Sequence, residues 1–379
     1  MNLKNYKAGT FNNQFGYRSF LPNKINLEWN ITSPEIHALL EEANLKLGEL
    51  NAFAVLLPEI DTFIRMHVAK EATLSSRIEG TRTTLDEAML EAKDIEPEKI
   101  DDWQEVRNYM EAMNHCIRRL EKLPLSNRLI REAHKILLKG VRGKNKLPGE
   151  FRTSQNWIGG ATLKDARFIP PHHSFLPELM SDLERFLNNK EINVPHLIRI
   201  GLAHYQFEAI HPFLDGNGRI GRLLITLYLI DQQVLRKPIL YISDFIETNR
   251  TLYYSNLAAV SDNNELEQWL KFFLVGIIET AVKSSGTLLK IISLREKLEH
   301  EINSNLGRRA PNAHELLKLL YIKPVLTAGD VIENLKVSKQ TAHTLLTDFE
   351  HLKILKEQTG FSRNRVFYFA KFIHIFEKR

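Results

Sequence analysis

The sequence predicts a mainly α-helical protein with a small amount of β-structure, and three observations lead to this fold class. Apolar residues recur at three- and four-residue spacing along most of the chain, which is the period of an amphipathic helix. Few segments show the composition of strands. The chain has 379 residues, 43% of them hydrophobic and 26% charged, which is typical of a folded globular protein with two or three domains.

The first half of the chain contains three predicted helices and one predicted hairpin. Residues 33–50, 58–78 and 101–123 follow the helical period, and Ser33 is a candidate N-cap for the first of them. The pattern breaks at 152–171, where β-favouring residues surround two adjacent glycines. This composition predicts an irregular β-hairpin within an otherwise helical body.

Helical periodicity then continues almost to the C-terminus. The predicted helices are 175–189, 196–210, 219–235, 249–260 and 265–283. A lysine-rich helix at 286–303 is the best candidate for a linker between domains, because Gly307 and Pro311 follow it.

No targeting signal or membrane span is expected. The N-terminus lacks an apolar export segment, and no stretch reaches about 18 uninterrupted apolar residues. The single cysteine, Cys116, cannot form an internal disulfide, and its helical surroundings favour packing in the core. These features predict a cytoplasmic protein.

Positive charge is concentrated at the C-terminus. Residues 305–379 contain 13 Lys and Arg against 7 Asp and Glu, whereas the rest of the chain contains 38 against 39. A small basic unit on a neutral body suggests an anionic partner such as nucleic acid, although a solvated basic face remains the alternative.

The segment with the strongest chemical content joins two predicted helices and reads HPFLDGNGRIGR, from His211 to Arg222. Gly216 and Gly218 permit positive φ, so that successive backbone N–H groups can form an anion-binding nest. The N-terminus of the following helix favours phosphate. Arg219 and Arg222 lie three residues apart on one helix face and can bind separate phosphates of a polyphosphate.

The same segment contains a candidate base and a candidate metal ligand. His211 is a candidate general base at neutral pH, and Asp215 offers a hard oxygen of the kind that Mg²⁺ prefers. A lone histidine, a lone Gly-x-Gly or two arginines would each more often be structural. Their combination within twelve residues predicts attack of an activated hydroxyl on a phosphate.

The segment resembles the signature H-x-F-x-[D/E]-G-N-G-R-x-x-R of Fic domains at every specified position. The resemblance implies a helical-bundle core with a β-hairpin flap, and transfer of AMP from ATP to a Tyr, Thr or Ser hydroxyl of a protein with release of pyrophosphate. His211 would deprotonate the hydroxyl, and Asp215 would hold Mg²⁺ between the α- and β-phosphates. Phe213 would pin the loop to the core.

The resemblance also implies which residues contact the nucleotide. Asn217, Gly218 and Arg219 would surround phosphate oxygens, and Arg222 would bind the γ-phosphate. Residues 152–171 resemble the flap, whose edge pairs with an extended segment of the target protein.

Three positions bear on the adenine pocket. Tyr253 and Tyr254 resemble an aromatic pair near that pocket, with packing between helices as the alternative. Ser261 departs from the Asn that often contacts the base in the family, so the nucleobase stays open.

A second motif, from Ser75 to Gly80, resembles the inhibitory pattern [S/T]-x-x-x-E-[G/N] of Fic proteins. Without the resemblance, it would simply be a helix that ends at a glycine. The resemblance implies that Glu79 pairs with Arg222, occupies the place of the γ-phosphate and keeps the enzyme inactive. Released from this pair, Glu79 could instead position water for removal of AMP.

The C-terminal region predicts a winged helix-turn-helix. Thr327 and Ser338 are expected N-caps of two helices, and Gly360 separates two short extended runs that would form the wing. The expected apolar interior consists of Val331, Ile332, Leu335, Val337, Ala342, Leu345, Leu346 and Leu352. The expected contacts with duplex DNA are Lys339, Gln340, His343, Thr344, Arg363 and Arg365. Protein docking is the alternative role.

These observations divide the chain into an N-terminal helical region with the inhibitory motif at 1–100, a catalytic core at 101–290 and a winged-helix domain at 305–379. The leading interpretation is an autoinhibited protein adenylyltransferase with ATP and Mg²⁺. The alternatives are a nucleotide-sensing, DNA-binding transcription regulator and a metal-dependent hydrolase built on His204, His211 and Asp215. A homodimer is expected only from relatives and from the frequency of two-fold oligomers.

Overall fold

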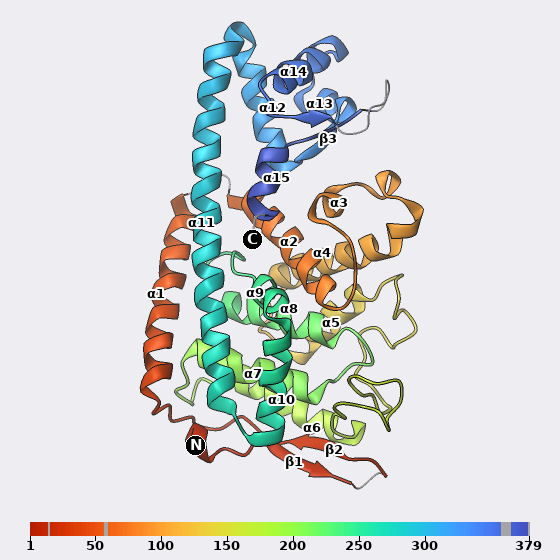
Figure 1. Ribbon diagram of the computed structural model, residues 1–379, viewed down its shortest axis with the longest axis vertical. Coiled ribbons are helices and arrows are strands. Elements are labelled where there is room, and N and C mark those ends of the chain that lie inside the picture. The colour runs from red at the N-terminus through yellow and green to blue at the C-terminus, as the bar shows by residue number, and fades with distance from the viewer. Residues whose placement is uncertain (14–15, 57–59, 358–364, 378–379) are drawn as a thin grey trace.

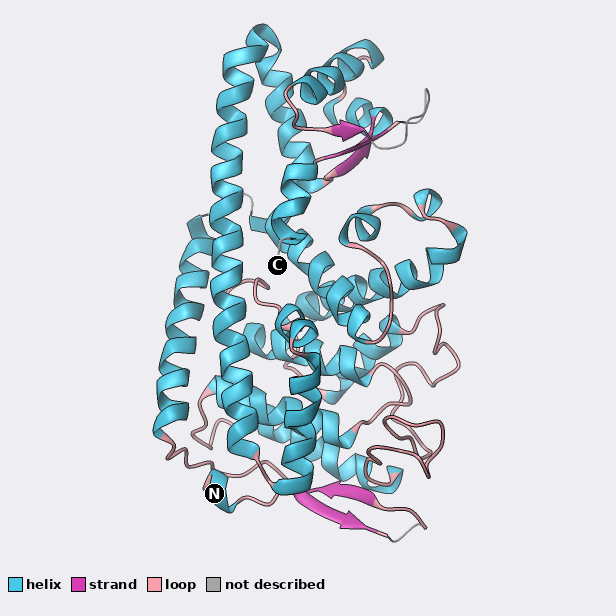
Figure 2. Ribbon diagram, viewed as in Figure 1, coloured by secondary structure: helices cyan, strands magenta, loops and turns pink. Residues whose placement is uncertain are grey.

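The computed structural model describes residues 1–13, 16–56, 60–357 and 365–377. It is 65% helical with small sheets, which confirms the predicted fold class. Figure 2 shows how little of the chain is in strands. The elements are β1 (Gly9–Asn12), β2 (Ser19–Pro22), α1 (Pro34–Leu56), α2 (Ile60–Ile78), α3 (Leu85–Met89), α4 (Ile100–Leu120), α5 (Asn127–Leu137), α6 (Leu176–Asn188), α7 (His196–Ile210), α8 (Asn217–Asp231), α9 (Ser243–Thr248), α10 (Arg250–Asn263), α11 (Leu266–Leu306), α12 (Ala310–Ile322), β3 (Val325–Thr327), α13 (Ala328–Leu335), α14 (Lys339–His351), β4 (Lys356–Glu357), β5 (Val366–Tyr368) and α15 (Ala370–Glu377).

A 41-residue helix, α11, runs along one side of the molecule, with α1 packed beside it (Figure 1). Residues 286–303 are helical, as predicted, but they continue α11 instead of forming a separate helix. Leu288, Leu298 and Ile302 in this segment are fully buried. This apolar stripe packs against other elements, so the segment behaves as a core helix that ends at Gly307.

The stretch Leu266–Ile322 is the one part of the described chain that is long and apolar enough to cross a membrane, judged by length and composition. Half of its most apolar window is buried inside the protein. The buried core helices of globular proteins often meet the same criterion of length and composition, so this match is weak evidence for a membrane span.

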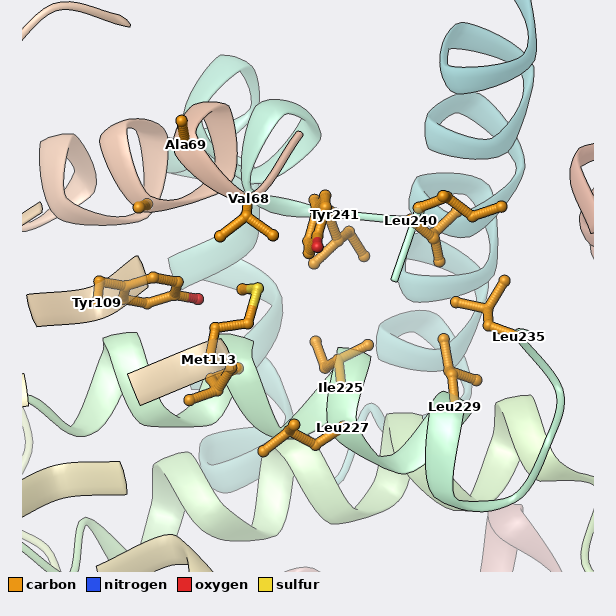
Figure 3. Close-up of a cluster of buried hydrophobic side chains, with 14 of the residues drawn as sticks. Val68, Ala69, Tyr109, Met113, Ile225, Leu227, Leu229, Leu235, Leu240 and Tyr241 are labelled. Atoms are coloured by element: carbon orange, nitrogen blue, oxygen red, sulfur yellow. The ribbon is translucent and has the colours of Figure 1, made fainter. Parts of the chain in front are cut away.

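The core brings the motif-bearing helices together. Figure 3 shows Val68 of α2, Met113 of α4 and Ile225 of α8 pointing into one cluster of buried side chains. The helices α2 and α8 are therefore packed against the same interior.

A hairpin of β1 and β2 near the N-terminus was not predicted. Its strands are antiparallel, with Phe11 opposite Phe20. The backbone N–H of Phe20 donates to the carbonyl of Ile169, which ties this hairpin to the flap region. The flap itself is irregular, as predicted, with one antiparallel bridge between Ile158 and Phe168.

The C-terminal elements include a helix-turn-helix, α13 and α14, beside a three-stranded sheet in the order β3-β5-β4. Thr327 and Ser338 cap α13 and α14 as predicted, whereas the hydroxyl of Ser33 donates to Glu267 and caps no helix. The predicted apolar interior residues are buried or partly buried. Arg365 pairs with Glu350, and Gly360 and Arg363 lie outside the described residues.

The chain then returns to α2 through α15. The ring of Phe376 in α15 lies 6.0 Å from the ring of Phe63 and 5.2 Å from that of His67, both in α2. The C-terminal part and the helix that leads to Glu79 therefore share packing contacts.

Candidate active site

The predicted chemical loop connects α7 to α8 through two residues with left-handed backbone conformation. His211 ends α7 at φ 49°, and Gly216 is the N-cap of α8 at φ 76°. Positive φ was also predicted for Gly218, and this is wrong because Gly218 lies within the first turn of α8. The backbone N–H groups of this turn have no partners within the helix and favour an anion.

Two side chains fix the shape of this loop. Phe213 is fully buried, as predicted, and stacks on His134 with the ring centroids 3.8 Å apart. The amide of Asn217 accepts from the N–H of Phe213 and donates to its carbonyl, both at 2.8 Å. Since the side chain of Asn217 holds the loop, only its backbone N–H remains to face a phosphate.

Arg222 and the motif at the end of α2 form a buried cluster. Arg222 donates through Nε to Oγ of Ser75 and through Nη2 to the carbonyl of Ser75, each at 2.8 Å. Nη2 also donates to Oε1 of Glu79 at 2.7 Å. Gly80, at φ 108°, follows the end of α2. The structure thus brings together the residues of both predicted motifs.

The carboxylate of Glu79 covers the start of α8. A Cβ atom on Gly218 would lie 2.4 Å from Oε1 of Glu79, so only glycine leaves room for it there. Burial acts to raise the pKa of Glu79, but Arg222 outweighs it and holds the pKa below its usual value. Glu79 is therefore an anion in the position where a helix N-terminus and an arginine bind negative charge.

The first arginine of the motif, Arg219, has a partner that sequence reasoning missed. Arg219 donates from Nη1 to Oε2 of Glu105 at 3.1 Å, and its side chain is 4% exposed. Arg142 also donates to Glu105. No signal in the sequence pointed to Glu105, since it lies in α4, more than 100 residues before Arg219.

His211 is uncharged and oriented by the backbone. Its Nδ1 lies 3.3 Å from the carbonyl oxygen of Glu208, which can only accept, so Nδ1 carries the proton and Nε2 has the free lone pair. Burial, and then the nearby Arg152, lower the pKa of His211 to about 4. Arg152 also donates to the carbonyl of His211 and ties the base of the flap to the loop.

Asp215 fits the role of a single carboxylate ligand to Mg²⁺. Its Oδ1 accepts from the N–H of Gly216, and its side chain is 41% exposed. Mg²⁺ in a nucleotide complex needs one or two carboxylates, with phosphate and water completing the octahedron.

The residues that the structure describes contain no group of three or more metal-ligating side chains. Nδ1 of His204 donates to the carbonyl oxygen of Gly221, and its Nε2 hydrogen-bonds to the hydroxyl of Tyr253. These contacts disfavour the hydrolase alternative.

A cavity of about 330 Å³ opens beside the loop, between the flap and α10. Tyr254 and Ser261 line this cavity, and Ile158 and Phe168 line it from the flap. Tyr253 is 1% exposed and hydrogen-bonds to His204, so it packs behind the cavity. Of the two predicted tyrosines, the structure therefore places Tyr254 alone in the cavity wall.

Comparisons with known proteins identify the family that this sequence matches. A model described as "Fic/DOC family N-terminal" matches residues 37–118, and one described as "Fic/DOC family" matches residues 124–229. The protein adenylyltransferase Fic of Drosophila erecta is 34% identical over 158 residues, which are 40% of this chain and 30% of that protein. Its Drosophila melanogaster counterpart matches with the same values. The match thus spans about a third of these relatives' length.

Solved structures share the fold. A Fic family protein from Desulfovibrio desulfuricans superposes with a TM-score of 0.56 at 22% identity, covering 89% of this chain and 96% of its own. A Fic domain protein from Bacteroides thetaiotaomicron superposes with a TM-score of 0.51 at 19% identity, covering 66% of this chain and 95% of its own.

Proposed function

Because this chain belongs to the Fic/DOC family, we propose that it is a protein adenylyltransferase that transfers AMP from ATP to a Tyr, Thr or Ser hydroxyl of a target protein. One observation carries the proposal. A single loop places an uncharged histidine, an exposed carboxylate and the N-terminus of a helix next to each other. The named activity of the Drosophila relatives supports the same reaction.

In this proposal, the chain's own groups bind the triphosphate and move one proton. The first turn of α8 and Arg222 bind phosphate oxygens, and Tyr254 lies beside the base. Nε2 of His211 takes the proton of the target hydroxyl as its oxygen attacks the α-phosphorus. The new P–O bond forms while the bond to the β-phosphate breaks, and pyrophosphate leaves. Mg²⁺ held by Asp215 would neutralise phosphate charge during this step.

The target segment is proposed to add to the flap as an extended strand. One arm of the flap, at Ile169, is already bonded to β2. The arm around Ile158 is therefore the outer one, with Trp157 partly exposed beside it. Main-chain pairing there would give affinity with little sequence preference.

The proposal includes autoinhibition by Glu79. Its carboxylate pairs with Arg222 and lies over Gly218, so a γ-phosphate would have to displace it. Arg222 is buried and the side chain of Glu79 is 35% exposed, so ATP binding must break a charge-assisted hydrogen bond on a buried guanidinium, which disfavours the productive complex.

A DNA-binding, nucleotide-sensing regulator is the second candidate, because α14 has an exposed polar face. Lys339, Gln340, His343 and Thr344 line a shallow groove on this helix. A sensor would bind ATP without transferring AMP, so turnover distinguishes the two candidates.

The test uses the Glu79→Gly variant with ATP labelled at either the α- or the γ-phosphate. We expect the α-label to become protein-bound and the γ-label to remain in pyrophosphate, and His211→Ala in the same background should abolish labelling. Protein-bound γ-label would indicate a kinase. ATP binding without either label would favour the sensor.

A further inference from the structure

We propose that Glu208 is a positioning residue that holds His211 and stabilises its protonated form during transfer. This inference rests on the proposed function, in which His211 takes the proton of the target hydroxyl.

The geometry places the carboxyl group of Glu208 beside the base. Both residues lie in the last turn of α7 and its cap, three positions apart, so their side chains share one face. Oε2 of Glu208 lies 4.0 Å from Nδ1 of His211. The backbone carbonyl of Glu208 accepts from the same nitrogen at 3.3 Å. Glu208 therefore places two oxygen atoms, its backbone carbonyl oxygen and Oε2, near Nδ1 of the His211 ring.

The surroundings of this carboxyl group are built to accommodate it. A Cβ atom on Gly221 of α8 would lie 2.2 Å from Oε1, so the missing side chain at Gly221 makes room for Glu208. Oε1 is buried and has no hydrogen-bond partner in the described part of the chain. A buried carboxyl oxygen without a partner is costly, which suggests that Glu208 is retained for a chemical reason.

Burial, modified by charged neighbours, determines the pKa of Glu208. Burial raises its pKa to about 7, while Arg222 acts to lower it and Glu79 acts to raise it. The titratable groups that face it from the packed elements are His204 and His211 of α7 and its cap, Arg222 of α8, Tyr253 and Tyr254 of α10, and Glu79 after α2. Glu208 therefore changes charge in the neutral pH range, where His211 alone would not.

The proposed role follows from this charge change. Above the neutral step, Glu208 is an anion 4.0 Å from Nδ1, and it favours the imidazolium that forms when Nε2 takes the hydroxyl proton. Below that step, Glu208 holds a proton and this stabilisation is lost. Glu208 and His211 then titrate in two separate steps, with pKa values of about 7 and about 4.

The first test needs no turnover. We would titrate the full-length protein labelled at histidine, and follow the His211 ring by NMR in the wild type, Glu208→Gln and Glu191→Gln. Glu191 is an exposed glutamate in the loop before α7, and it serves as the matched control. The wild type and the control should show two steps, and Glu208→Gln should keep only the step near pH 4. An unchanged His211 titration in Glu208→Gln would overturn the proposal.

The second test measures kcat/KM for AMP transfer against pH in the Glu79→Gly background. On the acid side, kcat/KM should fall with a midpoint below pH 7, because the carboxylate of Glu79 no longer raises the pKa of Glu208. We call this fall the acid limb. Adding Glu208→Gln should remove that limb and lower the high-pH rate about tenfold, the equivalent of one pKa unit of imidazolium stabilisation. The KM for ATP should stay unchanged.

Two outcomes of the second test would contradict the proposal. These are an unaltered acid limb, and a change confined to the KM for ATP, which would make Glu208 a nucleotide contact. Absence of transfer in every variant would count against the proposed function, and the NMR titration would then decide the role of Glu208.

Discussion

Asn217 is the side chain on which the shape of the loop between α7 and α8 depends most directly, because its amide hydrogen-bonds to both backbone groups of Phe213. The amide is buried and bonds at 2.8 Å in both directions. Asn217→Ala would leave a buried N–H without its acceptor, and we expect a loss of about 1–3 kcal/mol in the free energy of unfolding. Urea denaturation measures this loss, and unchanged stability would show that the loop does not need the brace.

Ser75 provides a second residue-scale prediction. Its hydroxyl accepts from Nε of Arg222, whereas the neighbouring hydroxyl of Ser76 is buried without a partner among the described residues. Ser75→Ala should loosen the end of α2 and raise basal AMP transfer, though less than Glu79→Gly does, because the carbonyl of residue 75 still holds Arg222.

Ser76→Ala is the matched control and should leave basal transfer unchanged. The rate of α-label incorporation measures both variants. Equal rates for the two serine variants would contradict the assigned role of Ser75.

At the scale of elements, the flap depends on one buried arginine. Arg152 is 2% exposed and donates to the carbonyls of His211, Ser154 and Pro171. Arg152→Met would leave these carbonyls without their donor and should destabilise the protein by about 3 kcal/mol. Hydrogen exchange should rise in residues 152–171 and stay slow in α11.

The exposed Arg167 of the flap is the control position, and Arg167→Met should leave exchange in the flap unchanged. Fast exchange throughout the chain in Arg152→Met would indicate global unfolding, and would contradict a local anchoring role.

The sequence was sufficient to predict the helices and caps that depend on residues close together in the chain. Apolar periodicity predicted the helices, and polar N-caps at Thr327 and Ser338 predicted the starts of α13 and α14. The β1–β2 hairpin was missed because its pairing with Ile169 joins segments about 150 residues apart. The helical segments expected at 265–283 and 286–303 form one helix, α11, whose second half is held by buried side chains.

The candidate site was predictable to a similar extent. The motif located His211, Asp215 and Arg222, because these residues lie within twelve positions of one another. Glu105 and Glu208 were missed, since only tertiary packing brings Glu105 to Arg219 and only the buried geometry of α7 gives Glu208 its raised pKa.

At the scale of the whole molecule, buried neutral histidines make stability depend on pH. Burial lowers the pKa of His67 to about 3 and the pKa values of His134 and His204 to about 4. In the unfolded chain these groups bind protons near pH 6.5, so the unfolded state gains protons first as the pH falls. Stability should therefore be present above about pH 6.5 and decrease towards pH 4.

As the pH falls over that range, each of these histidines lowers the free energy of unfolding by about 1.4 kcal/mol per pH unit. Glu208 acts in the opposite direction, because its raised pKa makes the folded state bind one proton more than the unfolded state. We expect the unfolding temperature measured by calorimetry to fall between pH 7 and pH 5. A constant unfolding temperature over this range would mean that the histidines are not buried as neutral groups.

The central claim is that Glu79 holds a transferase site closed through Arg222. The most direct test compares the rate of AMP transfer from saturating ATP by the wild type, Glu79→Gly and Glu121→Gly. Glu121 is the exposed C-cap of α4, so Glu121→Gly matches the chemical change at another helix end.

We expect Glu79→Gly to transfer AMP at least about tenfold faster than the wild type. Loss of the ion pair removes more than about 1.4 kcal/mol of competition between Glu79 and the γ-phosphate for Arg222. The wild type and Glu121→Gly should stay slow. Equal rates for all three proteins would contradict the central claim.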